Sequence, residues 1–152
     1  MSLSTSRVVL ITGGSRGLGR NAALALAGGR ADILLTYRSR ADAPDAVVAQ
    51  IQALGRRAAA LPLDMADSAG FAGFATAVQA QLQAWGATGL QGLFNNAGEG
   101  LYAGFADTTP AQFDELVAVH LKGPYFLTQA LLPLIADGGR ILNVSSGLAP
   151  FS

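Results

Sequence analysis

Cysteine is absent from the 152-residue chain, and histidine, lysine and tryptophan each occur once. Without cysteine the chain can form no disulfide bond and has no thiolate for nucleophilic chemistry. The single histidine, His120, has no cysteine partner for a zinc site of the usual ligand set. The sequence therefore argues against thiol chemistry and against a metal centre.

Excess charge of one sign is also lacking, because ten basic residues balance ten acidic ones. The basic residues are dispersed, so no patch is suited to nucleic acid or to an anionic membrane. No signal peptide is recognisable, and no uninterrupted apolar run reaches the roughly 18 residues of a membrane span. We expect a cytoplasmic protein, and the abundant alanine with arginine in place of lysine indicates a bacterial source.

Apolar residues make up 51% of the chain, enough for the core of a single domain over residues 1–152. Five apolar runs predict strands, at Arg7–Thr12, Asp32–Tyr37, Ala58–Pro62, Gly89–Phe94 and Arg140–Ser145. Four helical patterns lie between them, at Gly17–Ala27, Ala43–Leu54, Ser68–Trp85 and Pro110–Ala136. This βαβαβαβαβ order predicts an α/β fold, a Rossmann-like doubly wound parallel sheet.

A glycine-rich turn follows the first predicted strand and leads directly into a helix. The helix start presents unpaired backbone N–H groups above the turn, where phosphate usually binds. Gly13 permits the tight turn, Gly17 lets the backbone approach a pyrophosphate, and Gly19 lets the helix pack closely. The predicted phosphate loop consists of Gly13, Ser15, Arg16, Gly17, Leu18 and Gly19.

The end of the second predicted strand is where the adenosine ribose of a dinucleotide would lie. The chain has no acidic residue at Thr36, Tyr37 or Arg38 to accept hydrogen bonds from free ribose hydroxyls. The guanidinium of Arg38 instead suits a 2′-phosphate, so we favour NADP(H) over NAD(H). The alternative is that Arg38 is a solvated surface charge, as most arginines are.

Several motifs occur together in a fixed order: TGGSRGLG at Thr12–Gly19, Asp64 after the third strand, NNAG at Asn95–Gly98, the helical segment His120–Pro133, and NVSS at Asn143–Ser146. In this order and spacing the chain resembles the short-chain dehydrogenase/reductase family, and is similar to 3-oxoacyl-carrier-protein reductases. The resemblance implies hydride transfer between nicotinamide and a carbonyl or alcohol substrate. It also implies a homodimer or homotetramer with a small-molecule substrate.

The resemblance further assigns roles to individual residues. It places Asp64 and Met65 against the adenine, and Asn96, Ala97 and Gly98 beside the nicotinamide ribose. Ser146 would orient the substrate carbonyl and stabilise the developing oxyanion. Taken without the other motifs, Ser146 would be part of an ordinary turn at the end of a strand.

His120 stands where the family usually has asparagine. It shares a predicted apolar helix face with Phe113 and Val117, so a packed structural histidine is one interpretation. Pro124 lacks an N–H and leaves the backbone carbonyl of His120 without its helical partner. Because the family holds a relay water largely through that carbonyl, the alternative interpretation is that His120 preserves the catalytic relay.

The family's Tyr-x-x-x-Lys pair is not found in this sequence. Its tyrosines are Tyr37, Tyr102 and Tyr125, and its lysine, Lys122, does not follow any of them by four residues. We therefore expect residues 1–152 to be the cofactor-binding part of a longer family domain, inactive alone. A non-catalytic NADP(H) sensor or scaffold is the alternative, whereas the NNAG motif and Arg38 argue against a flavin or mononucleotide binder. Glu99 and Tyr102 either border the substrate cleft or face solvent.

Overall fold

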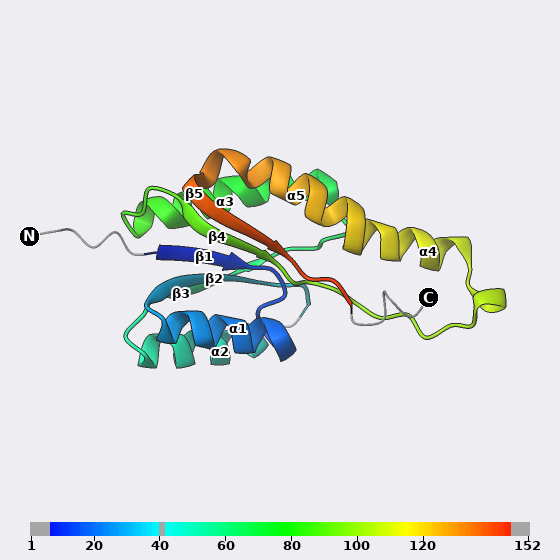
Figure 1. Ribbon diagram of the computed structural model, residues 1–152, viewed down its shortest axis with the longest axis horizontal. Helices are drawn as coiled ribbons and strands as arrows, with labels where there is room; N and C mark the ends of the chain where they lie inside the picture. The colour runs from blue at the N-terminus through cyan, green and yellow to red at the C-terminus, as the bar shows by residue number, and fades with distance from the viewer. Residues whose placement is uncertain (1–6, 40–41, 147–152) are drawn as a thin grey trace, which may run out of the picture.

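The computed structural model describes residues 7–39 and 42–146, which form one parallel sheet flanked by helices. The strands are β1 (Arg7–Ile11), β2 (Ala31–Tyr37), β3 (Ala58–Pro62), β4 (Leu90–Asn95) and β5 (Ile135–Asn143). They pair in the order β3-β2-β1-β4-β5, with every neighbouring pair parallel (Figure 1). The predicted Rossmann-like α/β fold is confirmed.

Helices cover both faces of this sheet (Figure 1). The longer ones are α1 (Gly17–Gly28), α2 (Asp42–Ala53), α3 (Phe71–Ala84), α4 (Pro110–Val117) and α5 (Gly123–Leu131). Helices α1 and α2 lie on one face, α3 and α5 lie on the other, and α4 extends past the carboxyl ends of the strands. Among the described residues, no helix combines the length and the apolar character needed to cross a membrane.

Alternate side chains of the central strands form the core, one layer on each face of the sheet. Ile33 and Leu35 point towards α1 and α2, whereas Leu34 between them packs with residues of α3 and α5. All three are fully buried. A strand buried on both faces needs such a continuous apolar run, and burial of each of these side chains contributes about 1.5–3 kcal/mol.

The order of the strands reverses beside β1, which has β2 on one side and β4 on the other. Backbone hydrogen bonds connect the ends of these strands to one another. The Thr12 N–H donates to the Phe94 carbonyl over 3.0 Å, and the Gly14 N–H donates to the Thr36 carbonyl over 3.1 Å. The carboxyl ends of the three strands thus form the crevice in which a ligand of this fold binds.

The prediction of a single continuous helix over Pro110–Ala136 is wrong, because the helix is interrupted in its interior and ends earlier. Its start is as expected, since Thr109 and Gln112 form a reciprocal capping box. A π-helical segment, Ala118–Lys122, then separates α4 from α5, because Pro124 has no N–H and the Gly123 N–H bonds the Ala118 carbonyl five residues back. The helix ends before Pro133, in a 3₁₀ turn over Leu132–Leu134.

The last strand also differs from the prediction of Arg140–Ser145. β5 begins at Ile135, directly after the 3₁₀ turn, and its pairing with β4 shifts register between Leu90 and Gly92. The sequence Asp137-Gly138-Gly139 lies inside this irregular strand, with Gly138 at a φ of 75°. Such a sequence is typical of a turn, which is why the strand was expected to start later.

Candidate functional site

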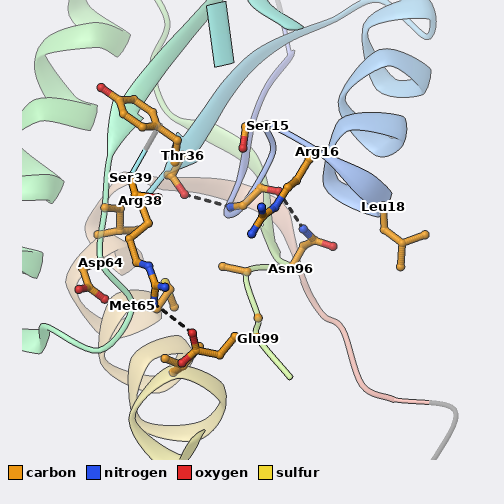
Figure 2. A pocket seen from close by; sticks show the side chains of 16 residues that line it. Ser15, Arg16, Leu18, Thr36, Arg38, Ser39, Asp64, Met65, Asn96 and Glu99 are labelled. Carbon is orange, nitrogen blue, oxygen red and sulfur yellow. Dashed lines mark hydrogen bonds and ion pairs between the residues drawn. The ribbon is translucent and has the colours of Figure 1, made fainter. Parts of the chain in front are cut away.

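A pocket of about 390 Å³ opens at the carboxyl ends of β1, β2 and β4 (Figure 2). It is lined by Gly13, Ser15, Arg16, Leu18, Thr36, Tyr37, Arg38, Ser39, Leu63, Asp64, Met65, Asn96, Ala97, Gly98, Glu99 and Val119. All but Gly17 and Gly19 of the predicted cofactor-binding residues are among them. The pocket lies at the point where the strand order reverses, as expected for this fold.

The turn between β1 and α1 forms one wall of the pocket. Gly13 and Gly17 have φ values of 64° and 54°, in the left-handed region that glycine adopts most easily. A Cβ on Gly13 would also lie 2.9 Å from the Cα of Ala97. No side chain caps the start of α1, so its first N–H groups remain available to an anion.

Thr12 connects this turn to the loop that follows β4. Its fully buried hydroxyl accepts hydrogen bonds from the backbone N–H groups of Asn96 and Ala97, over 3.0 and 2.9 Å. The side chain of Asn96 adds a third bond, in which Nδ2 donates to the Thr12 carbonyl over 3.0 Å. The two loops that border the pocket are therefore held in one arrangement, a role for Thr12 that the motif alone did not indicate.

Replacing Thr12 with valine is expected to lower the free energy of unfolding by about 1–3 kcal/mol, because two N–H groups lose their acceptor. The shape of the side chain is nearly unchanged, so the loss reports on the hydroxyl. Urea unfolding followed by circular dichroism measures it. Thr12→Ser keeps the hydroxyl and serves as the control; equal stabilities of the two variants would contradict this role.

Arg38 and Glu99 meet across the pocket from the ends of β2 and β4. Nη1 of Arg38 lies 3.1 Å from Oε2 of Glu99, and the two side chains are 56% and 26% exposed. Glu99 thus lines the pocket, whereas Tyr102, which the sequence grouped with it, is fully exposed. The sequence has no acidic residue at the end of β2, and the carboxylate beside Arg38 comes from the loop after β4.

His120 lies outside the pocket lining, but its ring contacts the loop that carries Glu99. Nε2 is 2.7 Å from the Glu99 carbonyl oxygen and 3.2 Å from the Glu99 nitrogen. A Cβ on Gly98 would come within 2.7 Å of Cε1, so the ring occupies the space that this glycine leaves. The residue is exposed, as are its helix neighbours Phe113 and Leu121.

Ser146, the predicted catalytic serine, follows β5. It is exposed and lies outside the pocket lining.

Sequence reasoning missed several residues that line the pocket, of which Thr36 has an identifiable function. Its hydroxyl accepts a hydrogen bond from the Gly13 N–H over 3.1 Å and so supports the glycine turn. A hydroxyl at the end of a buried strand was the signal available for it, as for Thr12.

Comparison with known proteins gives a consistent result. Residues 7–151 match the family model described as short chain dehydrogenase. The short-chain dehydrogenase/reductase FrzI of Cladobotryum is 34% identical over 140 residues, 92% of this chain and 52% of FrzI. A 3-oxoacyl-[acyl-carrier-protein] reductase of Synechocystis is 41% identical over 68 residues, 45% of this chain and 28% of that protein.

Among solved structures, a short chain dehydrogenase from Burkholderia cenocepacia in complex with NADP superimposes with a TM-score of 0.85. Its sequence is 38% identical, and the match covers 96% of this chain and 57% of that one. The matches thus cover 28%, 52% and 57% of the lengths of the Synechocystis, Cladobotryum and Burkholderia proteins, so the chain spans only about half the length of such relatives.

Proposed function

Because the chain belongs to the short-chain dehydrogenase/reductase family, we propose that residues 1–152 form the NADP(H)-binding domain of an oxidoreductase. The proposed reaction of the whole protein is hydride transfer between nicotinamide and a carbonyl or alcohol substrate. The observation that carries this proposal is the pocket itself, in which a glycine turn at the start of α1 faces Arg38 at the end of β2. The NADP complex of the Burkholderia relative supports the choice of cofactor.

The residues of the pocket fit a phosphorylated dinucleotide. A Cβ at Gly13 or Gly19 would overlap neighbouring atoms, so both glycines keep open a cradle of backbone beside the helix start. In our proposal this cradle and Ser15 hold the pyrophosphate, and Arg38 with Arg16 binds the 2′-phosphate. Asp64 and Met65 would contact the adenine, and Asn96, Ala97 and Gly98 the nicotinamide ribose.

Nicotinamide, when bound, supplies or accepts the hydride. Ser146 would donate a hydrogen bond to the substrate oxygen and stabilise the charge that develops there. The backbone carbonyl of His120 receives no N–H from Pro124, and we propose that it holds a relay water for proton transfer. The ring of His120 would then position the Gly98–Glu99 loop rather than exchange protons with substrate.

Exposed apolar side chains along α4 and α5 support assembly of the whole protein as a homodimer or homotetramer. Phe113 of α4, Tyr125 of α5 and Leu121 of the π-helical segment between them are each more than 60% exposed. Apolar surface of this kind commonly marks a protein interface. The proposal also includes a cytoplasmic, bacterial protein that acts on a small molecule.

Titration of the protein with NADPH and NADH by isothermal calorimetry tests the cofactor assignment. We expect NADPH to bind more tightly, and Arg38→Ala to weaken NADPH binding about tenfold through the loss of charge-assisted hydrogen bonds. Binding of NADH, which lacks the phosphate, should change less than about twofold. An equal effect on both cofactors would contradict the proposed role of Arg38. Binding without NADPH-dependent carbonyl reduction by the full-length protein would favour a sensor or scaffold.

A further inference from the structure

The ion pair between Arg38 and Glu99 spans the part of the pocket proposed for the adenosine ribose. The two residues are 61 positions apart in the chain, and their side chains meet over 3.1 Å (Figure 2). Arg38 is the residue proposed to bind the 2′-phosphate. Its guanidinium therefore already has an anionic partner before any phosphate arrives.

The position of Glu99 is fixed by its surroundings. Its main chain contacts Nε2 of His120 at both the nitrogen and the carbonyl oxygen, and the preceding Gly98 lies against the same ring. The side chain of Glu99 is three-quarters buried. Its second oxygen, Oε1, is buried and has no hydrogen-bond partner within the described ranges. Because one oxygen of the Glu99 carboxylate is buried without a donor, the charge of that carboxylate depends more strongly on its remaining contact with Arg38.

We propose that Glu99 determines cofactor specificity by holding Arg38 and so weakening the preference for a 2′-phosphate. This inference rests on the proposed NADP(H) site. A 2′-phosphate must draw the guanidinium away from Glu99 and then lies near that carboxylate, so both the competition and the repulsion oppose it. An unphosphorylated ribose needs no contact with Arg38 and is affected by neither. Glu99 therefore narrows the difference in affinity between the two kinds of nucleotide.

Binding of 2′,5′-ADP and 5′-AMP to the full chain, measured by isothermal calorimetry, tests this role without any need for turnover. For Glu99→Gln we expect the dissociation constant of 2′,5′-ADP to fall about three- to fivefold, the effect of releasing a partly exposed ion pair. The constant for 5′-AMP should change less than about twofold, because no contact with Arg38 is involved. Glu115→Gln, which makes the same change of charge on the exposed side of α4, should alter neither constant.

Glu99→Gln in an Arg38→Ala background distinguishes competition for Arg38 from direct repulsion between Glu99 and the 2′-phosphate. We expect Glu99→Gln to have a smaller effect there, below about twofold, since only the repulsion between the carboxylate and the phosphate remains to be relieved. An unchanged or weaker affinity of Glu99→Gln for 2′,5′-ADP would overturn the inference, and so would an equal gain with and without Arg38. Glu99→Ala provides a second variant, for which the same direction is expected. If the unaltered protein bound neither nucleotide, the cofactor proposal would fail and this inference with it; binding without an effect of Glu99 would overturn this inference alone.

Discussion

Replacing Gly19 with alanine is expected to weaken NADPH binding by more than about a hundredfold and to destabilise the fold by about 1–3 kcal/mol. The added Cβ would overlap the Gly13 carbonyl oxygen and would lie 2.5 Å from Nδ2 of Asn96. Neither group can move freely, because Gly13 belongs to the tight turn and Asn96 is bonded to Thr12. The start of α1 must therefore shift away from the turn and disrupt the cradle. Calorimetric titration and urea unfolding measure the two effects.

Gly28→Ala is the matched control, because it places the same methyl group at the other end of the same helix. Nothing lies within 4 Å of the Cβ that it adds, and Gly28 is not among the residues with positive φ. We expect wild-type affinity for NADPH and a stability that is unchanged or slightly raised. Retention of tight binding by Gly19→Ala would show that the cradle tolerates a side chain there.

Replacing Arg57 with alanine is expected to lower the free energy of unfolding by about 3 kcal/mol, through the loss of the partner of a buried charge. The side chain of Asp32, at the opposite end of the sheet from the pocket, is only 2% exposed. Arg57 donates to it from Nε over 2.8 Å and from Nη2 over 2.7 Å, and its guanidinium lies over the ring of Trp85. The backbone N–H of Arg57 also donates to Asp32 and survives the substitution, which places the loss at the lower end of the usual range.

Arg56→Ala removes an identical side chain one position earlier and serves as the control. Its guanidinium makes no hydrogen bond or ion pair with the residues at 7–39 and 42–146, so we expect a change within about 0.5 kcal/mol. Affinity for NADPH should be unchanged in both variants. A loss below about 1 kcal/mol for Arg57→Ala, measured by urea unfolding, would mean that water solvates Asp32 well enough to replace the guanidinium.

The sheet and the glycine turn were predictable because their determinants are local. Continuous apolar runs such as Ile33–Leu35 are required where helices cover both faces, and the structure buries them as expected. Thr109 and Gln112 likewise interact within one helical turn, so local contacts determine the helix start that was predicted at Pro110. The order of strands and helices then leaves few topologies for a parallel sheet.

The contacts that define the charge of the pocket were not predictable in the same way. Glu99 reaches Arg38 only because β2 and β4 both end beside β1, and nothing near either residue in the chain indicates the pair. The orientation of His120 depends equally on a distant loop, since its ring occupies the space left open by Gly98. Local patterns left Glu99 either at the substrate cleft or in solvent, and His120 either packed on an apolar helix face or preserving the relay. They could not decide between these alternatives, because tertiary contacts set the positions of both side chains.

The π-helical segment at Ala118–Lys122 has a consequence for which changes of chain length the protein can tolerate. Such a segment is equivalent to one residue inserted into a regular helix. Because the segment takes up one extra residue within a turn, deleting a residue there would leave the residues that follow on nearly the same face of the helix. Leu127 and Leu131, both fully buried, would keep their places in the core. A single-residue deletion here should therefore threaten the fold less than a deletion within the regular part of α5, which would rotate the residues that follow by about 100°.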